Sequence, residues 1–252
     1  MVFERFSPLV AAGVLLMGAG NMAPLSAQVH VKNVVLVHGA WADGSGWQAV
    51  YNLLQRKGYN VAIAQIPLTS LKDDVAATAR VIARMDGPTI LAGHSYGGVV
   101  ITEAGHDQKV VGLVYVSAFV PDAGESLLKM IEGAPEPPLQ PSADGFLFFN
   151  PAVFPKAFAQ DLPAEQSAFL AAAQVPVAAA AFGAAVTNPA WKVKPSWYLV
   201  AADDHIVPAA AARAWAKRAG ATVAESPGSH AVFISHPQGV VDLIEAAALG
   251  KR

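Results

Sequence analysis

The stretch PTILAGHSYGGVV, residues 88–100, places a serine between two glycines directly after a run of apolar residues. TILAG is typical of a buried strand, and GGVVITEAGH, residues 97–106, is typical of a helix. Gly-x-Ser-x-Gly between a strand and a helix is the pattern of a nucleophile elbow, a strained turn that exposes a serine hydroxyl. Gly93 and Gly97 leave room for such a turn around Ser95, and Gly98 lets the helix pack against the sheet. The alternative is a plain strand–helix turn in which the glycines serve only close packing.

Strand-like and helix-like segments alternate on both sides of this stretch. Apolar runs predict strands at residues 31–41, 60–68, 89–93, 109–120, 196–204 and 221–226. Helical periodicity predicts helices at residues 46–59, 70–87, 97–106, 208–220 and 237–250, and Ser70 with Asp73 fits a capping box at the start of the second. This alternation predicts an α/β fold, with a mostly parallel sheet covered by helices on both faces.

A segment at about residues 122–195 interrupts the alternation. It is rich in Pro, Ala and Phe and contains short helical patches such as PAEQSAFLAAAQ, residues 163–174. We interpret it as an inserted helical cap at the carboxyl ends of the strands, where open α/β sheets bind ligands. Its phenylalanines, among them Phe148 and Phe158, predict an apolar substrate pocket to which Trp41 could contribute. For any single ring, the alternative is that it only packs the cap onto the core.

Composition and charge exclude several classes of protein. Of the 252 residues, 54% are hydrophobic and 14% are charged, which is typical of a folded globular chain. The net charge of -2 at pH 7 provides no basic field, so we expect no nucleic-acid partner. The absence of cysteine excludes disulfides and thiolate metal sites. The sequence shows neither a metal-ligand cluster nor a nucleotide-binding glycine loop, so we predict no metal and no cofactor.

The amino terminus predicts export. Residues 1–27 contain Arg5 near the start, an apolar run from Leu9 to about Gly20 and small residues ending at Ala27, a pattern typical of a secretory signal peptide. The rest of the chain, residues 28–252, is then one domain with its cap insertion. We expect a periplasmic or secreted protein without stable membrane association after cleavage. A buried helix or an uncleaved anchor is the alternative.

An activated serine needs a base and an acid that orients the base. Behind a nucleophile elbow the expected chain order is serine, then acid, then histidine. His230, in the loop sequence SPGSHAVF after the last predicted strand, fits the base. Asp204, at the end of a predicted strand in YLVAADDHIVP, fits the acid. Asp203 and Asp122 are the competing candidates for the acid.

Two backbone amides are expected to form an oxyanion hole beside Ser95. One belongs to the residue after the nucleophile, Tyr96, and the other to a loop that follows an earlier strand. HGAW, residues 38–41, lies at that place, which makes Ala40 the second donor. His38 comes before the serine in the chain, so we interpret it as a brace for this loop.

These motifs together resemble the α/β-hydrolase superfamily. The stretches that carry the resemblance are VVLVHGAWADGSGW, LAGHSYGG, LVYVSAFVPDAGES, WYLVAADDHIVP and GSHAVFISHP. Within the superfamily the chain looks like the small-cap branch, which holds plant methylesterases, hydroxynitrile lyases and bacterial carboxylesterases. The resemblance implies a roughly eight-stranded sheet and a triad of Ser95, Asp204 and His230.

Departures from that branch favour ester hydrolysis. Hydroxynitrile lyases of the branch carry a threonine and a lysine where this chain has Gly39 and Ala231, which disfavours cyanohydrin cleavage. We expect a serine esterase acting on small to medium, apolar carboxylic esters through an acyl-enzyme. The alternatives are a binding protein that keeps the triad without turnover and a lyase on the same scaffold.

Overall fold

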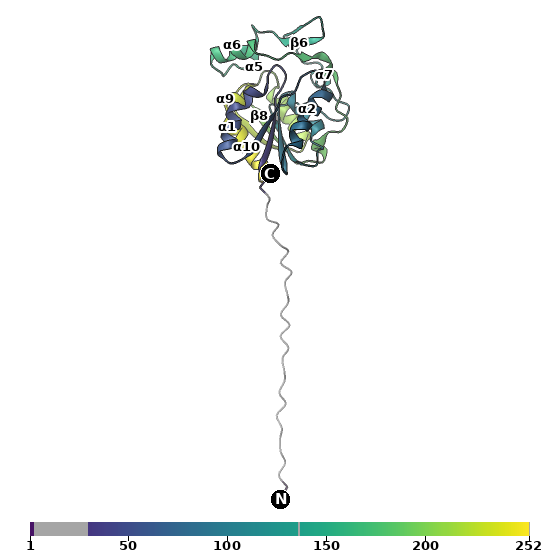
Figure 1. Ribbon diagram of the computed structural model, residues 1–252, viewed down its shortest axis with the longest axis vertical. Helices are drawn as coiled ribbons and strands as arrows, with labels where there is room; N and C mark the ends of the chain where they lie inside the picture. The colour runs from purple at the N-terminus through teal and green to yellow at the C-terminus, as the bar shows by residue number, and fades with distance from the viewer. Residues whose placement is uncertain (3–29, 136, 252) are drawn as a thin grey trace.

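A six-stranded parallel sheet forms the centre of the protein (Figure 1). The computed structural model describes residues 1–2, 30–135 and 137–251, so nearly all of the predicted signal peptide lies outside the described residues. The strand order is β2-β1-β3-β4-β8-β9. The strands are β1 (Asn33–Val37), β2 (Asn60–Ala64), β3 (Thr89–His94), β4 (Val110–Val116), β8 (Ser196–Ala201) and β9 (Thr222–Ser226).

The apolar runs of the sequence correctly predict these strands. Each of them contains one strand of the sheet, and every pair of neighbouring strands is parallel. Within the described residues, the central sheet therefore has six strands rather than the roughly eight that the resemblance implies. No further apolar run between β1 and β9 joins the sheet, because the remaining short strands pair with one another elsewhere.

Helices cover both faces of the sheet. Helices α1 (Gln48–Arg56), α9 (Val232–Ser235) and α10 (Pro237–Ala248) lie on one side, and α2 (Leu71–Ala83) lies on the opposite side (Figure 1). Helices α3 (Gly97–Ala104) and α8 (Ala209–Arg218) pack on the same face as α2. Short 3-10 helices occur at η1 (Gly44–Trp47) and η2 (Ala190–Lys192). Among the described residues, no helix is both long enough and apolar enough to cross a membrane.

The inner strands β1, β3, β4 and β8 are buried on both faces, which explains their apolar runs, whereas the edge strand β9 is partly exposed. In β1, Val34 and Leu36 join the core beneath α1 and α10, whereas Val35 and Val37 join the core beneath α2 and α3. Side chains of a strand alternate between the two faces, so both sets must be apolar when both faces are covered. The carboxyl ends of these rigid strands can then hold side chains in fixed positions.

The predicted N-cap at Ser70 is confirmed, although the Asp73 carboxylate accepts the Ser70 hydroxyl rather than its backbone N–H. The hydroxyl of Ser70 accepts a hydrogen bond from the backbone N–H of Asp73 at 3.1 Å and donates one to the Asp73 carboxylate at 2.7 Å. These contacts satisfy a backbone donor that the first turn of a helix leaves free.

The insertion between β4 and β8 is a mixed cap rather than a helical one. It contains helices α4 (Leu127–Met130), α5 (Phe154–Phe158), α6 (Ala164–Ala172) and α7 (Ala179–Gly183), and strands β5 (Leu139–Pro141), β6 (Phe146–Phe149) and β7 (Val177–Ala178). The three strands form an antiparallel sheet of order β5-β6-β7. A tight turn with Gly145 at a φ of 87° leads into the aromatic run FLFF, and that combination favours a hairpin.

The cap lies over one end of the central sheet. Figure 1 shows α5, α6, β6 and α7 together at the end opposite the carboxyl terminus. The indole N–H of Trp41, in the loop after β1, donates a hydrogen bond to the carbonyl of Leu147 in β6 at 2.9 Å. This contact joins the cap directly to the loop in which the sequence places an oxyanion donor.

Candidate active site

Ser95 lies on a strained turn between β3 and α3. Its φ of 53° falls in the left-handed region that side chains other than glycine rarely adopt. A Cβ atom on Gly93 would lie 2.5 Å from the carbonyl oxygen of Gly97, and one on Gly98 would lie 2.4 Å from that of Phe119. The glycines therefore allow a backbone approach that any side chain would block, as the elbow pattern predicts.

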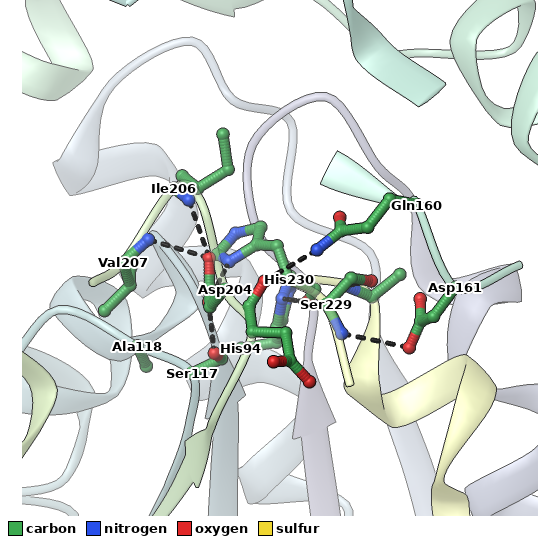
Figure 2. A network of polar contacts seen from close by, with 12 residues as sticks. His94, Ser117, Ala118, Gln160, Asp161, Asp204, Ile206, Val207, Ser229 and His230 are labelled. Carbon is green, nitrogen blue, oxygen red and sulfur yellow. Dashed lines mark hydrogen bonds and ion pairs between the residues drawn. The ribbon is translucent and has the colours of Figure 1, made fainter. Parts of the chain in front are cut away.

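Asp204 and His230 meet in the loops that follow β8 and β9. The Nδ1 atom of His230 lies 2.8 Å from Oδ2 of Asp204, and neither side chain is exposed. Figure 2 shows Asp204 at the centre of a group of donors: Ile206 and Val207 donate backbone N–H bonds to Oδ1, and the Ser117 hydroxyl donates to Oδ2. Burial would raise the pKa of Asp204, but His230 and these hydrogen bonds together lower it.

This contact determines which nitrogen of His230 can act as a base. A carboxylate accepts hydrogen bonds, so Nδ1 carries the proton and Nε2 of the neutral ring carries the lone pair. Nε2 is buried and has no hydrogen-bond partner within the described part of the chain. The lone pair of Nε2 is therefore available to another group.

His94 fixes the backbone of His230 beside the elbow. Its Nε2–H donates to the carbonyl of His230 at 2.8 Å, and the two ring centroids lie 4.6 Å apart. Burial, followed by the neighbouring His230, keeps the pKa of His94 well below its usual value, so this ring stays neutral. Since His94 precedes Ser95 directly, the hydrogen bond holds the His230 loop against the nucleophile turn. No role for His94 is predicted from the sequence, although its place inside the elbow motif is a signal.

The predicted oxyanion donors, Ala40 and Tyr96, belong to two segments that meet at Ser95. Tyr96 follows Ser95 at the start of α3, and Gly39 approaches so closely that a Cβ there would lie 2.7 Å from Cβ of Ser95. Among the described residues, no acceptor takes the backbone N–H of Ala40 or Tyr96. Both amides are therefore free to bind an anionic oxygen.

His38 braces the loop that carries Ala40. Its Nδ1–H donates to the carbonyl of Gly39 at 2.9 Å, and its Nε2 accepts the backbone N–H of Ile66 at 3.1 Å. Both contacts fit one neutral tautomer, and burial lowers the pKa of this ring. The brace predicted from the sequence is thus what these contacts provide.

The two competing acids, Asp203 and Asp122, bind other partners. Asp203 is exposed and accepts the backbone N–H of Gly228 at 3.2 Å, and Asp122 forms an ion pair with Lys192. Of the carboxylates that the structure describes, Asp204 is the one hydrogen-bonded to His230.

Of the three apolar residues predicted for substrate contact, two lie near the site. Phe158 stands edge-on to His230 with ring centroids 4.7 Å apart. Trp41 packs against Phe149, with ring centroids at 5.2 Å. Phe148 is 36% exposed and points away, because adjacent residues of β6 face opposite sides and Phe149 is the buried one.

A short segment of the cap forms hydrogen bonds with the loops that carry Asp204 and His230. The Phe158 carbonyl accepts the N–H of Ala231 at 3.0 Å, and Oδ2 of Asp161 accepts the N–H of Ser229 at 2.9 Å. The Gln160 amide donates to the carbonyl of Asp203 at 2.6 Å (Figure 2). We call residues 158–161 the cap clamp. Neither this clamp nor Ser117 is predicted from the sequence, because their contacts join segments far apart in the chain.

Metal-ligating side chains do not gather at this site or elsewhere in the described chain. Within residues 30–135 and 137–251, no cluster of three or more His, Cys, Asp or Glu side chains could hold a metal ion.

Comparison with known proteins supports the same architecture. A sequence model of the Alpha/beta hydrolase family matches residues 34–243. The chain is 31% identical over 107 residues to the pyrethroid hydrolase of Sphingobium wenxiniae, a match covering 37% of this chain and 38% of that protein. It is 33% identical over 153 residues to the carbendazim hydrolyzing esterase of a Nocardioides species, covering 54% of this chain and 62% of that protein. These two matches span less than two thirds of either relative.

A solved structure matches over more of its length. The pyrethroid hydrolase from Sphingobium faniae superposes with a TM-score of 0.74 at 26% identity, covering 86% of this chain and 97% of that one.

Proposed function

Since the chain belongs to the Alpha/beta hydrolase family, we propose that it is a serine hydrolase that cleaves small to medium, apolar carboxylic esters through an acyl-enzyme. The observation that carries the proposal is the buried, unpartnered Nε2 of His230. The ring is held by Asp204 on its other nitrogen and by His94 on its backbone. A base prepared in this way beside a strained serine fits nucleophilic catalysis.

In the first half of the reaction, Oγ of Ser95 attacks the ester carbonyl carbon while Nε2 of His230 takes the hydroxyl proton. The carbonyl oxygen becomes an oxyanion and accepts hydrogen bonds from the N–H groups of Ala40 and Tyr96. When the tetrahedral intermediate collapses, the bond to the leaving alcohol breaks and His230 returns the proton to that oxygen. Asp204 stays ionised and stabilises the protonated ring.

In the second half, water attacks the acyl-enzyme. His230 takes one proton from the water, and the same two amides hold the second oxyanion. The bond to Oγ of Ser95 then breaks, the serine recovers its proton from His230, and the carboxylic acid leaves. No group beyond the chain, the ester and water is needed to balance either half.

The surroundings of His230 support an apolar, uncharged substrate. Phe158 packs against the His230 ring, Phe154 stacks on Phe158 at 4.5 Å, and Phe149 packs on Phe154, all three buried. A charged ester would lose its hydration against these rings without gaining a partner. The names of the two curated relatives add pyrethroids and carbendazim as substrates worth testing.

A chain-length series of 4-nitrophenyl esters tests the proposal, with a pyrethroid and carbendazim added to the panel. We expect turnover by the wild type and loss of turnover in Ser95→Ala, whose circular dichroism spectrum should match that of the wild type. Ligand binding without turnover by the wild type would support a binding protein instead. Full activity in Ser95→Ala would refute the assigned nucleophile.

The predicted export signal also belongs to the proposal. We propose that residues 1–27 direct the chain to the periplasm or the medium and are then removed. Amino-terminal sequencing of the protein purified from the expressing cell's periplasm or medium should begin near Gln28, and an intact Met1 would contradict cleavage.

A further inference from the structure

Asp74 is a buried carboxylate that joins the elbow to a neighbouring loop. It lies in the first turn of α2 and has no exposed surface. Oδ2 accepts the hydroxyl of Tyr96 at 2.8 Å, and Oδ1 accepts the backbone N–H of Leu68 at 2.7 Å. One side chain thus holds both the elbow and the loop that precedes α2.

Both partners of Asp74 belong to the surroundings of the site. Tyr96 provides the amide that follows the nucleophile, and its ring lies 5.6 Å from that of Phe182 in the cap. Leu68 has a φ of 59°, and its carbonyl accepts the N–H of Ala178 in β7 at 2.8 Å. Asp74 therefore connects the oxyanion side of the elbow to the cap through a strained residue.

Capping of the amino terminus of α2 does not explain the Asp74 carboxylate. Ser70 already caps the helix by accepting the N–H of Asp73, and Asp74 points inward to Tyr96 and Leu68 instead. Burial raises the pKa of Asp74 to about 6, although the bonds from Tyr96 and Leu68 oppose that change. Surroundings that disfavour the charged form of a carboxylate make its burial costly to the stability of the fold. The presence of Asp74 at this position therefore calls for a reason.

We infer that Asp74 is a positioning residue that holds the Tyr96 hydroxyl and thereby aims the Tyr96 amide at the oxyanion. This inference rests on the proposed ester hydrolysis. An oxyanion donor works only when its N–H points at the place where negative charge develops. With Phe182 against the ring and Asp74 on the hydroxyl, the side chain of Tyr96 is fixed at two points. Its peptide group then has little freedom to turn.

The test compares Tyr96→Phe and Asp74→Asn with a matched control, Thr78→Val. The Phe variant keeps the ring but removes the hydroxyl, and the Asn variant keeps an acceptor for Leu68 while weakening the hold on Tyr96. Thr78 is buried in the same helix and donates to the backbone carbonyl of Asp74 at 2.9 Å, so its replacement perturbs α2 but leaves the Tyr96 contact. Each variant is assayed for kcat and KM on a 4-nitrophenyl ester and for inhibition by an alkyl trifluoromethyl ketone, which forms an oxyanion on Ser95.

We expect both test variants to lower kcat about tenfold with KM nearly unchanged. Inhibition by the trifluoromethyl ketone should weaken by a similar factor. The double variant should be no worse than the more impaired single one, because one hydrogen bond links the two residues. Wild-type values in both test variants would overturn the inference, as would equal losses in Thr78→Val. If the wild type itself fails to turn over esters, the proposed function fails and the inference falls with it. Wild-type turnover with unaffected variants refutes the inference alone.

Discussion

Asp204 accepts four hydrogen bonds, and one comes from Ser117, a serine to which the sequence analysis assigns no role. Ser117 follows β4, has a φ of 46° and donates to the same Oδ2 atom that binds His230. A hydroxyl at that atom helps to keep the carboxylate ionised and its orientation fixed. The strained backbone of Ser117 brings the hydroxyl within reach of this oxygen.

We expect Ser117→Ala to lower kcat about tenfold, because a hydrogen bond to an ionised group is lost beside the base. Ser117→Gly provides a matched variant, since glycine tolerates the positive φ but also lacks the hydroxyl. The pH dependence of kcat/KM on a 4-nitrophenyl ester measures the effect. Equal losses in both variants would identify the hydroxyl as the cause, whereas activity within about twofold of wild type in either would contradict this role.

At the scale of elements, the cap clamp adds contacts from the cap to the loops of the acid–base pair. Ser95 is only 3% exposed and His230 is fully buried, with Phe158 of the clamp packed against its ring, so we expect substrate to enter when cap contacts loosen. The same segment that covers the site therefore also positions it. Substrate access and alignment of His230 become linked through residues 158–161.

Asp161→Ala should lower kcat about tenfold, because the N–H of Ser229 loses its acceptor next to His230. Asp161→Asn retains an acceptor oxygen and should restore most of the activity. Asp144→Ala, an exposed substitution in the β5–β6 turn of the cap, serves as the control and should leave kcat unchanged. Steady-state kinetics of the three variants checks the prediction, and an unchanged kcat in Asp161→Ala would contradict it.

The elements also show what the sequence can and cannot predict. Continuous apolar runs predict the inner strands because both of their faces are buried, and Ser70 with Asp73 predicts the start of α2. The edge strand β9 is partly exposed and carries a weaker pattern. The cap was only partly predicted, since its short strands β5 and β7 carry too few residues for a periodic pattern. Elbow residues could be found because they are adjacent in the chain. The contact between Ser117 and Asp204 could not, because it depends on how β4 pairs with β8.

For the whole molecule, Asp74 makes stability depend on pH. Its pKa is about 6 in the folded protein, compared with 3.8 for an unperturbed aspartate, so the folded chain binds this proton more tightly than the unfolded chain. The stability contributed by this group is fully present below about pH 4 and is lost as pH rises to about 6. By linkage, this difference in pKa corresponds to about 3 kcal/mol in the free energy of unfolding. The pKa of Asp204 is lowered in the folded protein, so the stability that this group contributes is present above about pH 4 and is lost as the pH falls below that value.

Asp74→Asn removes this dependence. We expect the free energy of unfolding of the variant, relative to wild type, to increase between about pH 4 and 6 and to level off above. Urea unfolding at several pH values across this range measures the difference. A constant difference would show that Asp74 keeps an ordinary pKa in the folded protein.

The position of the insertion has a consequence for biosynthesis. Strand β4 must pair with β8, which the chain reaches only after the whole cap, and closing such a long loop is slow. The ribosome therefore synthesises the serine turn and its neighbouring strands well before Asp204 and His230. Until those residues are made, Ser95 has no base. We expect reactivity to appear only when the final two strands dock, which makes hydrolysis the last property that a newly made molecule acquires.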